Sequence, residues 1–212
     1  MQWRMKHSVR NFIGLVLVGL LGLAWLGTHG FSIGPREPDA SAAAPAESSG
    51  DALIGGHFEL VNGQDFTMTE KNFSGKYMLI YFGYTHCPDL CPTALGAMQN
   101  AVAELGIKPD KLVPIFITID PDRDTPKVMG DYVAHFGPNM VGLTGTPAQI
   151  KQAADAYKVY YAKVPDEKSP SNYSMDHSGF IYLMGPDGKY MTHFPYNIPE
   201  TQLKDALDKM VQ

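Results

Sequence analysis

The stretch YMLIYFGYTHCPDLCPT, Tyr77 to Thr93, places a long apolar run directly before the only two cysteines of the chain. Eight largely apolar residues in succession predict a central strand that is covered on both faces. After the second cysteine, Pro92 suits the first turn of a helix, and apolar residues follow at helical spacing. Cys87 and Cys91 therefore lie on a loop at the carboxyl end of a buried strand, where α/β sheets carry their chemistry.

The rest of the chain after residue 51 predicts further strands and helices. Leu112 to Ile119 reads as a second buried strand, and Thr125-Pro126, Thr146-Pro147 and Pro199 each open a helix. A hairpin is predicted from strands over Phe180 to Met184 and Lys189 to Phe194, joined by a turn over Gly185 to Gly188. The apolar side chains expected to point inward are Val128, Tyr132 and Phe136 in one helix, Ile150, Ala153 and Tyr157 in the next, and Leu203, Leu207 and Met210 in the last. This order predicts an α/β sandwich.

The N-terminus has the pattern of a membrane anchor. Arg4, Lys6 and Arg10 precede a run from Asn11 to Pro35 that contains no Asp, Glu, Lys or Arg. The length suffices to cross a bilayer, and the excess of positive charge places the N-terminus in the cytoplasm and the rest across the membrane. The alternative is a cleaved signal peptide, but the nearest Ala-x-Ala, at 42–44, lies well beyond the apolar run.

These patterns divide the chain into three parts. Residues 1–34 are predicted to form the cytoplasmic N-terminus and a transmembrane helix, residues 35–51 a flexible linker rich in Pro, Ala and Ser, and residues 52–212 one folded domain. The formal net charge of the chain is −5. This acidic balance argues against nucleic acid as a partner.

The two thiols admit three interpretations. A structural disulfide would close a very short loop and stabilise little, because the entropic gain grows with loop length. A redox-active dithiol would suit the N-terminal end of a helix, although three residues rather than two separate Cys87 from Cys91. A metal site would use both thiolates as soft ligands and would need a third ligand, such as an imidazole, to bind Cu(I). Five histidines follow the linker, and spacing alone does not choose among them: His57, His86, His135, His177 and His193.

Three motifs in order resemble the Sco/SenC family. They are YFGYTHCPDLCPT at 81–93, ITIDPDRDTP at 117–126 and YSMDHSGFIYLMGPDG at 173–188, and the resemblance runs from about Gly55 to the C-terminus. Members of this family are membrane-anchored copper-binding proteins that assist assembly of the dinuclear copper centre of cytochrome c oxidase. The resemblance implies a thioredoxin-like sandwich with a central mixed sheet.

The resemblance also implies a site. It places the copper thiolates on Cys87 and Cys91 and the copper imidazole on His177, with copper carried as Cu(I) or Cu(II). The same two cysteines would form a redox-active disulfide. Four carboxylates of the second and third motifs are expected near the site as residues that orient it or a partner: Asp120, Asp122, Asp124 and Asp176. The alternative for the first three is a loop with carboxylates at a helix start.

The implied function is a copper chaperone that delivers one copper ion to the oxidase, and the alternative is a thiol-disulfide reductase that keeps the oxidase cysteines reduced. The implied partners are the copper-site subunit of the oxidase, other copper chaperones and thioredoxin-like reductases. The implied location is the bacterial inner membrane, with a single span and the domain in the periplasm or an equivalent intermembrane space.

An enzymatic role is less favoured by the residues around the cysteines. Thioredoxin-like oxidoreductases place a cis-proline opposite their cysteines, whereas the corresponding place here is Asp176-His177-Ser178. Peroxiredoxins place a threonine three residues before the reactive cysteine, whereas Thr85 is two residues before Cys87. Both differences favour a metallochaperone over an enzyme. Among the methionines, Met175, two residues before His177, is the one candidate for a transient copper contact.

Overall fold

The computed structural model describes residues 54–165 and 173–211. The predicted transmembrane helix and linker lie outside the described residues. Within the described ranges, no helix combines the length and the apolar character that a membrane crossing requires.

A seven-stranded mixed sheet forms the centre of the domain, in the order β2-β1-β5-β4-β3-β8-β9. Strands β3, β4 and β5 run parallel, whereas β8 pairs antiparallel with β3 and β1 pairs antiparallel with β5. The strands are β1 (Glu59–Asn62), β2 (Thr67–Thr69), β3 (Tyr77–Gly83), β4 (Leu112–Thr118), β5 (Val141–Thr144), β8 (Phe180–Met184) and β9 (Tyr190–Pro195). The predicted central strands and the C-terminal hairpin are confirmed.

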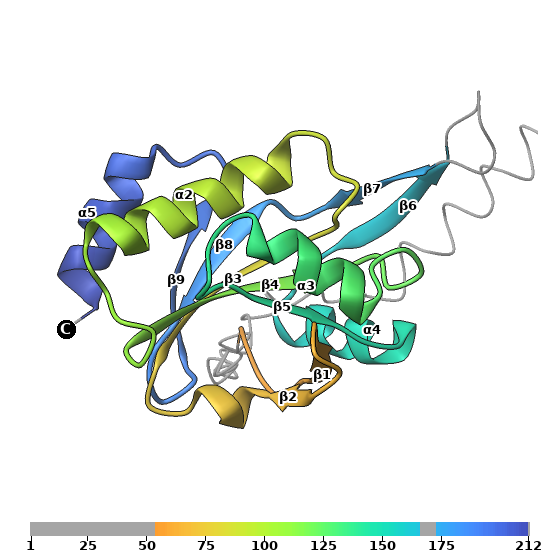
Figure 1. Ribbon diagram of the computed structural model, residues 1–212, viewed down its shortest axis with the longest axis horizontal. Helices are drawn as coiled ribbons and strands as arrows, with labels where there is room; N and C mark the ends of the chain where they lie inside the picture. The colour runs from red at the N-terminus through yellow and green to blue at the C-terminus, as the bar shows by residue number, and fades with distance from the viewer. Residues whose placement is uncertain (1–53, 166–172, 212) are drawn as a thin grey trace, which may run out of the picture. The chain divides into compact units, whose positions relative to one another are not determined.

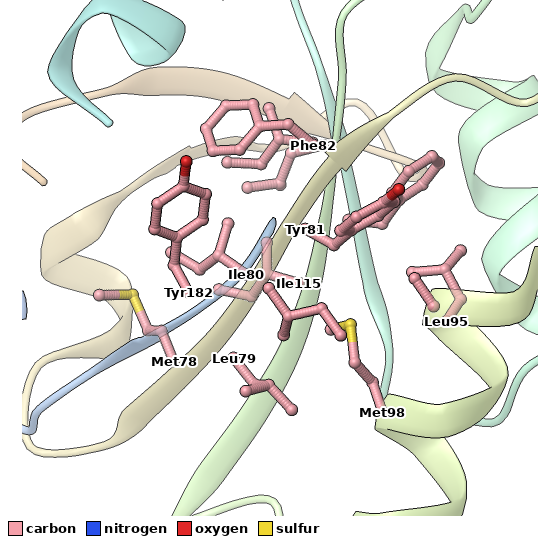
Figure 2. Close-up of a cluster of buried hydrophobic side chains, with 14 of the residues drawn as sticks. Met78, Leu79, Ile80, Tyr81, Phe82, Leu95, Met98, Ile115 and Tyr182 are labelled. Atoms are coloured by element: carbon pink, nitrogen blue, oxygen red, sulfur yellow. The ribbon is translucent and has the colours of Figure 1, made fainter. Parts of the chain in front are cut away.

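Helices cover both faces of this sheet. The helical elements are η1 (Glu70–Phe73), α2 (Leu90–Glu104), α3 (Pro126–Ala134), α4 (Pro147–Ala156) and α5 (Glu200–Met210), and α2 and α5 lie side by side (Figure 1). Side chains alternate along β3, so that Leu79 and Tyr81 point toward Leu95 and Met98 of α2, while Phe82 points to the opposite face (Figure 2). There it packs on Tyr157 at the end of α4. The α/β sandwich with a mixed sheet is therefore confirmed.

The helix starts follow from their capping residues. Thr125 Oγ1 accepts a hydrogen bond from the backbone N–H of Val128 at the start of α3, and Thr146 forms a capping box with Gln149 at the start of α4. Proline occupies the first turn of both helices, where its missing N–H costs nothing. Ile150, Ala153 and Tyr157 point inward as predicted.

The inward face predicted for α3 is confirmed in part. Tyr132 and Phe136 are half-buried and pack against the core, but the buried positions of the helix are Met129 and Val133, and Val128 is half-buried. The reason is Gly142 in β5: a Cβ built there would lie 2.9 Å from Val133 Cγ1 and 3.1 Å from the Met129 carbonyl oxygen. The helix packs directly on this glycine, and the Tyr132 ring turns sideways to pack on Phe116.

The sequence did not predict five of the strands or their pairing. The missed elements are the β1–β2 hairpin, the four-residue strand β5 and a separate two-stranded ribbon of β6 (Tyr161–Pro165) and β7 (Tyr173–His177). In this ribbon Tyr161 pairs with His177 at one end and Pro165 pairs with Tyr173 at the other. Figure 1 shows the ribbon extending away from the seven-stranded sheet. It matters for the site because His177 is its last residue.

Candidate metal centre

The two cysteines lie where β3 passes into α2. Cys87 is in the connecting loop, where its N–H donates to the Tyr84 carbonyl oxygen, and Cys91 lies in the first turn of α2. The backbone N–H of Cys91 donates to Cys87 Sγ over 3.4 Å. Both residues are buried and both are free thiols. The loop therefore holds two sulfur atoms side by side with little exposure to solvent.

The ribbon of β6 and β7 brings His177 to the same place. Its Nε2 lies 4.0 Å from Cys91 Sγ, although 86 residues separate the two in sequence. Its Nδ1 lies 3.1 Å from the carbonyl oxygen of Ser178. A carbonyl can only accept, so Nδ1 carries the hydrogen and the lone pair of Nε2 is directed toward the sulfur. The imidazole is thus held in the tautomer that binds a metal through Nε2.

Aromatic side chains fix the orientation of the imidazole. The rings of Tyr81 and Tyr84 both meet the His177 ring edge to face, with centroids 6.0 and 6.2 Å away. This geometry is favoured for aromatic pairs. The histidine is therefore positioned by its hydrogen bond to Ser178 and by two flanking rings.

The donor set fits a soft metal ion. Bonds of about 2.3 Å to sulfur and about 2.0 Å to nitrogen let one ion join atoms up to about 4.3 Å apart, so the 4.0 Å between Cys91 Sγ and His177 Nε2 is within reach. Thiolates with one imidazole select copper or zinc among common metals. In residues 54–165 and 173–211, no group of three or more His, Cys, Asp or Glu side chains is already spaced to hold a metal ion. Small side-chain shifts would have to complete the site.

The two thiols share their protons unequally. The hydrogen bond from the Cys91 thiol is the largest influence on Cys87 and lowers its pKa against the opposing effect of burial. The same contact, together with burial, raises the pKa of Cys91. The reduced pair therefore carries its first negative charge on Cys87. Binding a metal through both sulfurs requires the proton of Cys91 to leave.

Gly83, the last residue of β3, makes room for the second sulfur. A Cβ at this position would lie 2.6 Å from Cys91 Sγ, 2.9 Å from Phe116 Cε2 and 3.2 Å from Tyr81 Cε1. Real Cβ atoms do not approach neighbours this closely, so any larger residue would displace Cys91. The sequence places Gly83 inside the first motif, but only the packing shows why a glycine stands there.

Asp124 holds the cysteine loop in place through hydrogen bonds. Its carboxylate is fully buried and accepts hydrogen bonds from the backbone N–H and the hydroxyl of Thr85, at 3.0 and 2.6 Å, and from the hydroxyl of Thr118 at 2.6 Å. These bonds tie the end of β4 to the residues just before Cys87. Asp124 thus supports the loop that leads to Cys87.

Asp120 and Asp122 support the ribbon that carries His177. The fully buried Asp120 accepts hydrogen bonds from the Arg123 guanidinium and, at 2.7 Å, from the Tyr173 hydroxyl. Asp122 accepts a bond of 2.5 Å from Lys163 in β6. Asp176 is exposed, on the side of β7 opposite the buried Met175. The structure therefore places the first two carboxylates against the ribbon, and a role for Asp176 in orienting His177 stays a prediction.

Among the five candidate histidines, His177 is the one in contact with a cysteine sulfur in the described part of the chain. His86 is adjacent to Cys87 in sequence, but its ring meets Thr85 Oγ1 at 3.2 Å and is about half exposed. The others have contacts elsewhere: His57 with Glu70, His135 with the Tyr132 carbonyl and His193 with Tyr190. Met175 is buried against the core. Sequence reasoning missed Arg123 and Tyr173, although both stand within the quoted motifs.

The comparisons with known proteins agree with this geometry. The sequence profile of the SCO1/SenC family matches residues 46–212. A "SCO2-like protein" of Rickettsia felis is 42% identical over 187 residues, which cover 87% of this chain and 90% of the relative. The structure titled "Crystal structure of Arabidopsis thaliana ScoI with copper bound" is 40% identical, with a TM-score of 0.69 over 74% of this chain and 96% of that one. The structure titled "Crystal Structure of Yeast Sco1 with Copper Bound" is 38% identical, with a TM-score of 0.68 over 75% and 88%. The fold is thus thioredoxin-like, and the chain belongs to the SCO1/SenC family.

Proposed function

We propose that this protein is a copper chaperone that binds one copper ion through Cys87, Cys91 and His177 and delivers it to the dinuclear copper site of cytochrome c oxidase. The observation that carries the proposal is the approach of His177 Nε2 to Cys91 Sγ within 4.0 Å. Relatives of about 40% identity hold copper in their crystal structures, which supports copper as the cargo. Delivery to the oxidase rests on the family resemblance.

The site suits a cargo that must be released again. Two sulfurs and one nitrogen supply three ligands, a number that Cu(I) accepts and that leaves one side open to an incoming ligand. Cys87 is 6% exposed, whereas Cys91 is completely buried. We infer that thiolates of the partner replace the ligands one at a time, beginning on the side of Cys87 and His177. The buried Cys91 would then release the ion last.

The remaining parts of the proposal concern location. Residues 1–34 would anchor the protein in the bacterial inner membrane, residues 35–51 would tether the domain, and residues 52–212 would face the periplasm or an equivalent intermembrane space. The partner would be the copper-site subunit of the oxidase in the same membrane. Labelling of Cys87 in intact spheroplasts by a membrane-impermeant maleimide tests this topology, because a cytoplasmic domain would stay unlabelled until lysis.

Anaerobic titration of the reduced full chain in detergent with Cu(I), in competition with a chromogenic chelator, tests the ligand set. We expect one ion per chain for the wild type and a loss of affinity of at least about tenfold for His177→Ala, Cys87→Ser and Cys91→Ser. His193→Ala is the matched control, because His193 contacts Tyr190 and not a cysteine. Fully reduced wild type that failed to compete for Cu(I) would contradict the proposal.

A thiol-disulfide reductase is the second candidate, favoured by the asymmetry of the two thiols. Dithiol exchange sites pair a thiol of lowered pKa with a second thiol, and the lowered pKa of Cys87 beside the fully buried Cys91 has this form. His177→Ala separates the two functions. Loss of oxidase assembly with retained thiol exchange supports copper delivery, whereas unaffected assembly supports the reductase.

A further inference from the structure

Two tyrosine hydroxyls near the cysteines have no hydrogen-bond partner. The oxygens of Tyr81 and Tyr132 are both buried, and within the described ranges nothing is aligned to pair with them. Buried polar groups are almost always paired, since an unpaired one costs free energy. Each unpaired group in a native structure therefore calls for an explanation, and a role in the neighbouring site is one.

Tyr81 is the closer of the two to the metal centre. The whole residue is buried in the strand that ends at Gly83, and its ring points to the α2 face of the sheet (Figure 2). A Cβ built on Gly83 would touch both Cys91 Sγ and Tyr81 Cε1, so the sulfur and this ring edge flank one point. The Tyr81 ring also meets the His177 ring edge to face. Tyr81 therefore lies against two of the three proposed ligands.

The chemistry of the neighbouring thiol explains why the hydroxyl is unpaired in the reduced protein. A neutral thiol is a weak acceptor, so a hydroxyl beside it gains little by pairing with it. The Tyr81 ring edge and Cys91 Sγ border the same point beside Gly83, which places the unpaired hydroxyl on a ring next to this sulfur. A thiolate that binds a metal is a charged acceptor, and hydrogen bonds to charged acceptors are about twice as strong as neutral ones.

We propose that the Tyr81 hydroxyl is a hydrogen-bond donor to the Cys91 thiolate of the copper-loaded site, and that Tyr81 is thereby a positioning residue that raises copper affinity. This inference rests on the proposed function. Two thiolates and one Cu(I) leave a net charge of −1 in a buried site, and a donor already in place stabilises that charge without reorganisation. The unpaired hydroxyl of the metal-free protein is the cost of this preorganisation.

Tyr132 is the second tyrosine with an unpaired hydroxyl, and it lies farther along the same row of rings. Its ring packs on Phe116, which in turn stacks on Tyr81. Its hydroxyl is buried and unpaired like that of Tyr81, but Phe116 is the ring that links it to Tyr81 and the site. We expect Tyr132 to contribute less than Tyr81.

The test compares Tyr81→Phe, Tyr132→Phe and Tyr157→Phe in the full chain. Each change removes one buried hydroxyl, and Tyr157, packed on Phe82 at the opposite face of the sheet, is the matched control. In anaerobic chelator competition we expect Tyr81→Phe to bind Cu(I) about tenfold more weakly, the smallest loss usual for a hydrogen bond to a charged acceptor. Tyr132→Phe should lose less than Tyr81→Phe, and Tyr157→Phe should bind like the wild type.

Unfolding of the metal-free, reduced protein supplies the second readout. Removing an unpaired hydroxyl should leave the denaturation midpoint of Tyr81→Phe unchanged or higher, while its copper affinity falls. A purely structural role would lower both together and would overturn the inference, as would equal Cu(I) affinity of wild type and Tyr81→Phe. Failure of the wild type itself to bind Cu(I) is a different result, because it would overturn the proposed function.

Discussion

The guanidinium of Arg123 lies over the ring of Tyr173, 3.7 Å from its centre, and donates a hydrogen bond of 3.0 Å to the Tyr173 carbonyl oxygen. Arg123 belongs to the loop between β4 and α3, and Tyr173 is the first residue of β7. The buried carboxylate of Asp120 completes the contact by accepting from both side chains. The position of His177, four residues after Tyr173, therefore depends on three residues that the proposed ligand set does not include.

Tyr173→Phe should weaken this contact and, with it, the copper site. The change keeps the ring over Arg123 but removes the 2.7 Å hydrogen bond to the buried Asp120. Hydrogen bonds to charged groups are worth about 2 kcal/mol, so we expect the free energy of unfolding to fall by about that amount. We also expect weaker Cu(I) binding, because His177 is less firmly held. Urea unfolding and the chelator competition measure the two effects.

A double-mutant cycle shows whether the effect on copper passes through His177. In a His177→Ala background, Tyr173→Phe should cause no further loss of Cu(I) affinity, since the residue that it positions is absent. Tyr160→Phe is the control because this tyrosine is 61% exposed beside the same ribbon. Additive losses in the cycle would show that Tyr173 acts on the site by another route.

Gly83→Ala should damage the site by steric displacement. The new Cβ would come within 2.6 Å of Cys91 Sγ and 2.9 Å of Phe116 Cε2. Overpacking of a filled core costs about 1–3 kcal/mol, and a shifted Cys91 should bind Cu(I) at least about tenfold more weakly. Unfolding and copper competition measure both. Gly96→Ala is the control, because its Cβ would meet no atom within 4 Å, and alanine in a helix should raise stability by about 0.5–1 kcal/mol.

Local patterns were sufficient to predict the elements that build the cysteine loop. A few consecutive residues suffice to predict β3, from its apolar run, and the first turns of α3 and α4, from their Thr-Pro pairs. Strand β5 was missed because VGLT is only four residues long and contains a glycine, which is uncommon in strands. This glycine, Gly142, gives α3 the space to pack on the strand. The buried positions of α3, Met129 and Val133, were missed for the same reason, since contact with a distant strand decided them.

The site was harder to predict because its parts come from distant segments. Spacing could not choose His177 among five histidines, and the family resemblance made the choice. The contact of Arg123 with Tyr173 spans 50 residues, and no periodic pattern encodes it. The carboxylates of the second motif were expected near the site, but their actual partners are Thr85, Tyr173 and Lys163. They act on the loop and the ribbon through hydrogen bonds that only the fold creates.

Asp124→Asn should loosen the cysteine loop. The buried carboxylate accepts three hydrogen bonds from Thr85 and Thr118, and an amide has only one accepting oxygen. We expect a loss of about 2 kcal/mol in the free energy of unfolding and faster alkylation of Cys87, two residues beyond Thr85. Asp122→Asn is the matched control from the same loop. Its exposed ion pair with Lys163 should contribute less than about 1 kcal/mol, so equal losses in the two variants would contradict the role given to Asp124.

The stability of the reduced protein should fall as the pH drops from about 8.5, the ordinary value for a thiol, toward the pKa of Cys87, which its hydrogen bond from Cys91 lowers to about 4. Between these values the unfolded chain binds a proton on Cys87 that the folded protein does not bind, so stability is lost on acidification. The raised pKa of Cys91 acts only above this range. Urea unfolding at pH 8 and pH 5 measures the difference.

Two variants isolate the contribution of the cysteine pair to this pH dependence. Cys87→Ser has no thiol at this position, so subtracting its unfolding free energies from those of the wild type removes the effects of every other titrating group. Cys91→Ala removes the largest cause of the lowered pKa, and the pH midpoint for alkylation of Cys87 by iodoacetamide should therefore move up toward the ordinary thiol value. An unchanged midpoint would show that Cys91 does not donate to Cys87, and the backbone N–H groups of Cys91 and Asp89 would then have to stabilise the thiolate of the reduced site.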